Sequence, residues 1–111
     1  RFDPYEVELW VQALRRSGEN FPPIQALKSM TGHALSAAGA LEIVALCLQL
    51  SHGFLHPNLN ALPIHPKIRK LISSASIPLV YQEADLKTGI TASFGFGDVN
   101  ACAVLRKWND N

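Results

Sequence analysis

Charge, cysteine motifs and uninterrupted apolar runs are all scarce in this sequence. Only 17% of its 111 residues are charged and the net charge is +1, which excludes the concentrated basic face of a general nucleic-acid binder. Cys47 and Cys102 form no CxxC pair and no metal-type cluster. We therefore expect two buried, reduced thiols in a cytoplasmic protein. From its polar opening residues we expect no signal peptide.

The longest apolar stretch, Ala34–Leu50, is interrupted by Glu42 and Gln49 and is short for a membrane span. It predicts a core helix that is apolar nearly all round and packed on most sides. Its first half is rich in small residues, which indicates a tightly packed neighbour. Apolar residues make up 48% of this short chain, so we expect further protein to cover part of its surface.

Helix and strand signals predict an α/β layer that is incomplete by itself. Asp3, Pro4 and Glu6 form a capping pattern for a first helix. A short helix is expected over Pro66–Ile72. Apolar runs predict four strands, of which the last two flank a glycine turn and form an antiparallel hairpin. The four are Ile24–Leu27, Leu79–Gln82, Ile90–Phe96 and Ala101–Trp108.

Three polar residues around the apolar helix could carry chemistry. His33 begins the helix, where the helix dipole favours a neutral imidazole that can donate one hydrogen bond to an oxyanion; the alternative is a helix-capping role. Lys28 is either functional or a solvated surface charge. Glu42, the only charge in the helix, must be paired, hydrogen-bonded or exposed on a narrow stripe with Gln49.

A glycine-rich turn near the end of the chain is the second candidate region. Gly95 and Gly97 permit backbone angles closed to other residues and let a chain approach a ligand. An ordinary hairpin turn would account for these glycines, but it would not need the phenylalanines Phe94 and Phe96.

Together these motifs resemble a known family. Lys-Ser-Met-Thr-Gly-His at 28–33, the small-residue helix after it, and Ser-Phe-Gly-Phe-Gly at 93–97 with Asn100 are similar to the C-terminal half of β-ketoacyl-acyl-carrier-protein synthases. The resemblance covers nearly the whole chain. It implies an α/β fold: the C-terminal half of a thiolase-like layered enzyme, with a buried central helix and a closing antiparallel hairpin. Residues 1–111 would form one C-terminal domain, a fragment of a larger enzyme.

The resemblance also assigns roles to residues. His33 would stabilise the enolate formed when a malonyl thioester loses carbon dioxide, and Lys28 would form an ion pair with Glu42 behind the site. Phe96 would be the gate side chain, and its backbone N–H would contribute to the oxyanion hole. This gives His33, Lys28, Glu42 and Phe96 as catalytic, with substrate-binding positions at Thr31, Phe94, Gly95 and Gly97.

Some features of the family are altered or missing. The chain has Gly-Asp-Val-Asn at 97–100 where the family usually has Gly-Gly-Thr-Asn. Neither cysteine has the Thr-Ala-Cys-Ser setting of the family's nucleophile, and the family's first catalytic histidine is not found before Asp3. The remaining histidines do not indicate a metal site, since two lie beside prolines in loops and no carboxylate cluster joins them; they are His52, His56 and His65.

The implied reaction is a decarboxylating Claisen condensation of malonyl-acyl-carrier protein with an acyl thioester, in fatty acid or polyketide synthesis. No dissociable cofactor is expected, because phosphopantetheine is carried by the acyl carrier protein. The expected partners are that carrier protein, malonyl and acyl thioesters, the missing N-terminal half and a second copy in a homodimer, with no nucleic acid and no membrane span. The alternative is a non-catalytic partner of the chain-length-factor type, or a scaffold module.

Overall fold

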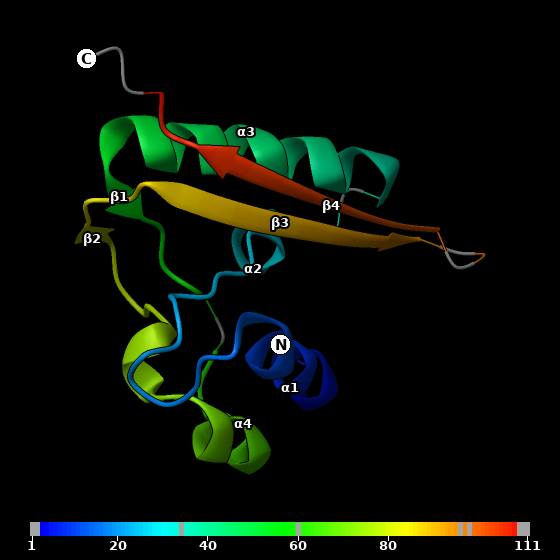
Figure 1. Ribbon diagram of the computed structural model, residues 1–111. Coiled ribbons are helices and arrows are strands. Elements are labelled where there is room, and N and C mark those ends of the chain that lie inside the picture. Colours follow the sequence, from blue (N-terminus) through cyan, green and yellow to red (C-terminus); the bar gives the residue numbers. More distant parts are fainter. Residues whose placement is uncertain (1–2, 34, 60, 96, 98, 109–111) are drawn as a thin grey trace.

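The computed structural model describes residues 3–33, 35–59, 61–95, 97 and 99–108. Helical elements come first along the chain and the longest strands come last, and Figure 1 shows two parts. In one part, helix α3 lies along the hairpin β3–β4; in the other, α1 and α4 pack together. The elements are α1 (Pro4–Leu14), α2 (Lys28–Thr31), the 3-10 turn η1 (Leu35–Ala37), α3 (Ala38–His52), β1 (Phe54–Leu55), α4 (Pro66–Leu71), the 3-10 turn η2 (Ser74–Ser76), β2 (Gln82–Glu83), β3 (Thr88–Gly95) and β4 (Val99–Arg106).

Helix α1 begins where the sequence predicts. Asp3 is the N-cap, and its carboxylate accepts a 2.9 Å hydrogen bond from the Tyr5 N–H. Pro4 occupies the first helical position, where a missing N–H costs nothing. The helix ends at Leu14 because Arg15 takes the left-handed conformation, with φ of 54°.

The predicted strand Ile24–Leu27 is wrong, because this segment has no neighbouring strand. A single buried side chain replaces the neighbour. Asn58, 3% exposed, accepts from the Ala26 N–H at 2.7 Å and donates to the carbonyls of Ile24 and Pro78, both at 3.0 Å. Its amide satisfies these backbone groups without a regular ladder, so the segment lies extended but unpaired with any strand.

The predicted strand Leu79–Gln82 is also wrong in most of its length. Only β2 (Gln82–Glu83) is a strand, and it pairs antiparallel with β1 (Phe54–Leu55). The preceding Tyr81 is outside the ladder, where its ring stacks on Phe54 with centroids 5.6 Å apart.

The closing hairpin is confirmed. β3 and β4 pair antiparallel in a continuous register that runs from Thr88 opposite Arg106 to Gly95 opposite Val99. Both strands begin two residues earlier than predicted. The expected short helix over Pro66–Ile72 is also confirmed, as α4.

The apolar run forms η1 followed by α3, and α3 ends at Gly53, whose N–H donates to the Gln49 carbonyl at 2.8 Å. By length and composition alone, Leu35–His52 could cross a membrane, with a mean hydropathy of 1.4. The η1 turn makes up its first three residues, and α3 packs along the β3–β4 hairpin. The run therefore serves as a helix of the α/β layer.

In this chain α3 is packed on one side, not on most sides as expected. The side away from the hairpin carries Leu41, Val44 and Leu48, which are 43%, 57% and 48% exposed. We call these three residues the α3 outer face. Their spacing of i, i+3 and i+7 puts them on one stripe of the helix. No described part of the chain covers this stripe.

The buried apolar core lies between α1 and α4. Its side chains come from α1, the segment after it, α4 and the residues that flank α4, so elements far apart in sequence close around it. Trp10, Val11 and Leu14 pack against it from α1. The buried members are Val7, Phe21, Ile64, Ile68, Ile72 and Ile77.

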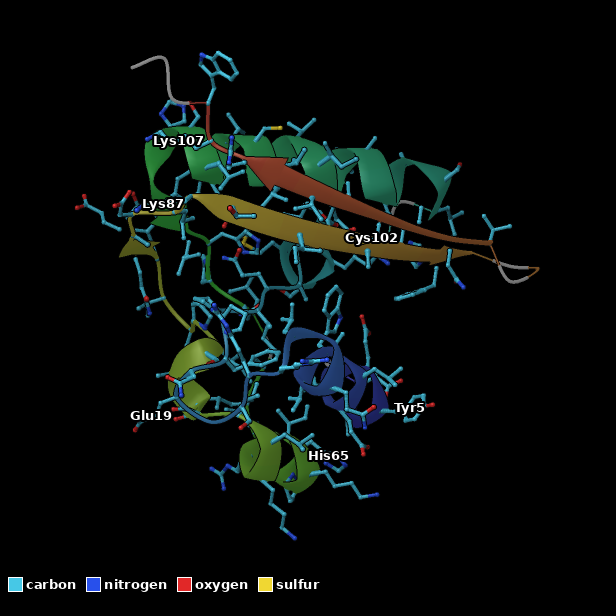
Figure 2. All side chains as sticks on the ribbon, in the orientation of Figure 1. Tyr5, Glu19, His65, Lys87, Cys102 and Lys107 are labelled. Atoms are coloured by element: carbon cyan, nitrogen blue, oxygen red, sulfur yellow. The ribbon has the colours of Figure 1, made fainter. Side chains whose placement is uncertain are left out.

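Two expectations about single side chains are wrong. Cys47 on α3 and Cys102 on β4 are free but exposed, because each lies on a surface that the described residues leave uncovered (Figure 2 labels Cys102). Gln49 does not lie on a solvent stripe: it is 4% exposed, and its Oε1 accepts from the His56 N–H at 3.2 Å. The last turn of α3, just before Gly53, places the Gln49 amide in the interior of the protein.

Candidate active site

The Lys28–His33 motif is a short helix followed by a turn. Lys28 begins α2, so it lies in a helix and not in the expected loop. The Gly32 N–H donates to the Lys28 carbonyl at 2.9 Å, and Gly32 has φ of 72°, which ends the helix. The Thr31 hydroxyl donates back to the Leu27 carbonyl at 3.2 Å. These bonds fix the backbone that leads into His33.

The ring of His33 is oriented by one hydrogen bond. Its Nδ1 accepts from the Leu35 N–H at 3.0 Å. With Nδ1 accepting from this N–H, Nε2 is the ring nitrogen that can donate. His33 is exposed, and Nε2 has no hydrogen-bond partner among the described residues. His33 therefore caps the turn that follows it, which is one of the two roles considered for this residue. Its other ring nitrogen is left to donate elsewhere.

Glu42 is half-buried on the side of α3 that faces β3. Its Oε2 accepts a hydrogen bond from the Thr91 hydroxyl at 3.3 Å. The ion pair expected between Lys28 and Glu42 is not formed among the described residues, because Lys28 is an exposed residue at the start of α2 and Glu42 faces the hairpin. The lone carboxylate of the helix is hydrogen-bonded, which was one of the options for it.

Helix α3 and strand β3 approach closely and run in opposite directions. A side chain at Gly39 would come within 3.1 Å of the Ser93 hydroxyl, and one at Gly89 would collide with Leu46. With Glu42 bonded to Thr91 between them, positions 39, 42 and 46 of the helix face positions 93, 91 and 89 of the strand. The two glycines permit this approach. It fixes which end of β3 lies beside the start of α3.

That antiparallel packing places the second motif near the start of α3. β3 continues past Ser93 into Phe94 and Gly95, so the hairpin turn lies at the same end of the layer as the start of α3 (Figure 1). The turn η1, which leads into α3, begins two residues after His33. Phe94 is 65% exposed and Gly97 has φ of 80°, which favours glycine. Phe96 lies outside the described residues. The start of the helical run that follows the first motif and the turn of the second motif, about sixty residues apart in sequence, thus lie at one end of the α3–hairpin layer.

The other histidines form no metal centre. His56 is 7% exposed, and one ring nitrogen lies 3.0 Å from the Pro57 carbonyl, while His65 accepts from the Lys67 N–H to cap α4. Within the part of the chain that the structure describes, no group of three or more His, Cys, Asp or Glu side chains could hold a metal ion.

Sequence reasoning missed three residues that position the site. Thr91 and Ser93 could have been found from strand alternation, because every second residue of β3 faces α3 and Glu42 needed a partner there. Asn58 carries no such signal, since its three bonds reach segments far away in sequence. The amide ties the segment before α2 to the loop after β1, and the Leu59 N–H adds a 3.1 Å bond to the Ser29 hydroxyl of α2.

Comparison with known families gives one match. Residues 2–62 match the model for the β-ketoacyl synthase, C-terminal domain. This range includes α1, the Lys28–His33 motif and all of α3, and it stops before α4. It covers more than half of the chain.

Individual relatives extend the likeness to the hairpin. The chain is 39% identical over 93 residues to 3-oxoacyl-[acyl-carrier-protein] synthase 1 of Escherichia coli K12, covering 84% of this chain and 22% of that protein. It is 34% identical over 104 residues to a β-ketoacyl synthase of the actinorhodin polyketide from Streptomyces coelicolor, covering 94% of this chain and 21% of that protein. The chain therefore spans about a fifth of the length of the relatives it matches.

The fold is also that of a solved ketosynthase. A type II polyketide ketosynthase, determined with its acyl-carrier protein and bound to a hexaketide, superposes with a TM-score of 0.71 at 37% identity, over 82% of this chain and 21% of that one. This confirms the expected fold class, a part of a thiolase-like α/β enzyme with a closing hairpin.

Proposed function

This chain belongs to the family of β-ketoacyl synthase C-terminal domains, and we propose that it provides the enolate-stabilising part of a carbon–carbon bond-forming site. The protein that carries it would condense malonyl-acyl-carrier protein with an acyl thioester, in fatty acid or polyketide synthesis. The relatives named for both pathways support this reaction class, and they do not choose between the pathways.

The proposed reaction has two chemical stages. An acyl group first moves from its thioester onto a cysteine thiolate of the enzyme, releasing the carrier thiol. The malonyl thioester then loses its carboxylate as carbon dioxide, and the electron pair left behind forms an enolate. The enolate carbon attacks the acyl carbonyl, a carbon–carbon bond forms and the cysteine leaves as thiolate. The product is a β-ketoacyl thioester two carbons longer.

His33 carries the proposal. Its Nδ1 is occupied by the Leu35 N–H at 3.0 Å, so the proton on Nε2 is the one that can be donated. An enolate oxygen needs a neutral donor positioned before charge develops, and a ring held by a backbone N–H meets that need. An imidazolium would instead require a proton on Nδ1, which would break the bond to Leu35.

Glu42 and Lys28 are proposed as positioning residues. Glu42, held by Thr91, would set the negative charge behind the site, and Lys28 would balance it once the site is assembled around substrate. Thr31 would present its backbone to the substrate from the end of α2. Lys28 and Glu42 form no ion pair among the described residues, so their pairing is proposed to need that assembly.

The hairpin turn is proposed as the gate of the acyl pocket. Phe94, Gly95 and Gly97 lie at the same end of the layer as the start of the helical run that follows His33, which supports a role beside the enolate site. Phe96 would supply the gate side chain and a backbone N–H for the oxyanion. Asp98 and Val99, which replace the family's usual Gly and Thr, would change how the turn moves.

The nucleophile is proposed to come from another part of the protein. Cys47 is in the middle of α3 and Cys102 is in β4, and neither lies at a turn before a helix. We therefore expect the 111-residue chain by itself to show no condensation. Turnover by the purified chain that is lost on Cys47→Ala or Cys102→Ala would contradict this.

The proposed partner is an acyl carrier protein, whose phosphopantetheine arm would bring both thioesters, with no dissociable cofactor. The solved ketosynthase was determined in complex with its acyl-carrier protein, which supports this choice of partner. We also propose that the intact protein is a homodimer.

The proposal can be tested on the described chain by 15N NMR of its histidine rings. We expect His33 to be the neutral tautomer with the proton on Nε2 at pH 7, and His33 Nδ1 to show the shift of an accepting, unprotonated nitrogen. His52 is the matched control, since its exposed ring has no hydrogen bond among the described residues. A His33 proton on Nδ1 would remove the basis for the enolate role.

The second candidate is a non-catalytic partner of the chain-length-factor type. Asp98 and Val99 favour it, because they alter the turn that would gate the pocket. Restoring the family's residues in the intact protein, with Asp98→Gly and Val99→Thr, discriminates between the two. Condensation that exists only in the restored variant would identify a non-catalytic protein.

A further inference from the structure

Five of the ten Lys and Arg residues of this chain lie around one turn, and that turn has no role in the proposed reaction. Arg15 and Arg16 follow α1, and Lys67, Arg69 and Lys70 lie on α4. All five are exposed. The sequence has no Asp or Glu from residue 43 to residue 82, so α4 and its flanks carry positive charge alone.

Backbone contacts join the two cationic segments. The Gly18 N–H donates to the Leu71 carbonyl at 2.9 Å, and the Ser73 N–H donates to the Gly18 carbonyl at 3.1 Å. The turn after α1 is therefore fixed to the C-terminal end of α4, next to the buried side chain of Ile72. Cations held on a fixed backbone lose less conformational entropy on binding than cations on a mobile loop.

The turn itself is hollowed. Arg15, Arg16, Ser17 and Asn20 line an open depression of the surface, and these residue types carry guanidinium, hydroxyl and amide donors. Guanidinium groups bind carboxylates through two parallel hydrogen bonds, and the hydroxyl and amide can add further donors. Glu19, the acidic residue of this turn, lies at its outer side in Figure 2 and does not line the hollow.

We propose that the hollow after α1, together with the cationic face of α4, is a docking surface for an acidic segment of a protein partner. Arg15 and Arg16 receive carboxylates in the hollow, and Lys67, Arg69 and Lys70 hold neighbouring acidic residues. A nucleic acid fits less well, because Glu6 and Glu8 of the adjacent α1 interrupt the positive field that a phosphate backbone would follow. This surface is independent of the reaction proposed above.

The test is fluorescence anisotropy with a labelled peptide of ten glutamates. Arg16→Glu combined with Lys70→Glu should weaken binding by about tenfold or more, since reversed charges repel the peptide. The matched control is Lys87→Glu combined with Lys107→Glu. These lysines are exposed and adjacent at the far end of the hairpin, where the Lys107 N–H donates to the Lys87 carbonyl at 2.8 Å (Figure 2). The control changes net charge equally and should alter affinity by less than about twofold.

Two further measurements keep the result interpretable. Amide NMR shifts on adding the peptide should map to residues 15–20 and 67–70. The neutral pair Arg16→Gln with Lys70→Gln should lose part of the affinity if the reversed pair fails to fold. Equal loss in the test and control pairs, shifts that map elsewhere, or tighter binding of single-stranded DNA of equal charge would overturn the proposal.

Discussion

The two parts of this molecule use apolar residues in opposite ways. Around α1 and α4, apolar side chains face one another and close a core in which Ile68 and Ile72 are each 2% exposed. Along α3 and the hairpin, many of them face outward: Val44 is 57% exposed and Val104 is 64% exposed. The α1–α4 part buries its apolar side chains against one another, whereas the α3–hairpin part leaves many of its apolar side chains exposed.

This difference separates the residues that stabilise the fold from the residues of the candidate site. The catalytic candidate Glu42 and its neighbours Thr91 and Ser93 lie half-buried in the α3–hairpin layer, and Phe94, Gly95 and Gly97 lie exposed at the end of its hairpin. An apolar surface next to exposed polar groups is the arrangement from which a binding site is built when another surface closes over it. We infer that the α1–α4 part anchors the layer and that the layer carries the chemistry.

The largest effect should come from cutting into the closed core. Ile68→Ala should lower the free energy of unfolding by about 3 kcal/mol, because the lost methyl groups leave a cavity that the packed neighbours cannot fill. Val44→Ala on the α3 outer face is the control, and it should change stability by less than about 0.5 kcal/mol. Urea denaturation of both variants measures the contrast. Equal losses would mean that α3 is covered in solution.

A slightly smaller effect is expected at the amide that joins the two parts. Asn58→Ala removes three hydrogen bonds and leaves the half-buried Ala26 N–H without this partner, so unfolding should become easier by about 2 kcal/mol. The matched control, Asn100→Ala on the exposed strand β4, should be nearly neutral. Hydrogen exchange at the Ala26 amide should accelerate in the Asn58 variant alone. Unchanged exchange would show that the segment is held by other contacts.

The smallest effect on stability is expected on the α3 outer face. Replacing Leu41, Val44 and Leu48 together by Gln should change the free energy of unfolding by less than about 1 kcal/mol, since all three side chains are already exposed. The same change should reduce self-association and binding of a hydrophobic dye, which the uncovered apolar stripe promotes. Light scattering measures the association. A parent chain that is already monomeric and binds no dye would show that the stripe is not a contact surface.

The sequence predicted local signals well and long-range partners poorly. The Asp3 cap and the glycine hairpin follow from residues close together, and both are confirmed. The strand expected at Ile24–Leu27 failed because its neighbour is the side chain of Asn58, more than thirty residues away. No periodicity or motif in the sequence predicts that the amide of a distant residue will bond to this segment.

In the candidate site, too, local features could be predicted from the sequence and long-range features could not. The positions of the Lys28–His33 motif and the glycine turn could be read from the sequence, and the place of the turn near the start of α3 follows from antiparallel packing of α3 on β3. The burial of Gln49 and the exposure of both cysteines could not be predicted. They depend on which other parts of the folded protein pack against these residues.

The measurement that tests the central claim most directly is a separation of the two half-reactions in the intact protein with His33→Ala. If Nε2–H of His33 donates to the enolate, malonyl decarboxylation should fall by roughly a hundredfold or more, as on loss of one oxyanion donor of about 3 kcal/mol. Acyl transfer to the cysteine should fall much less. Unchanged decarboxylation together with collapsed acyl transfer would contradict the account and would place His33 with the nucleophile.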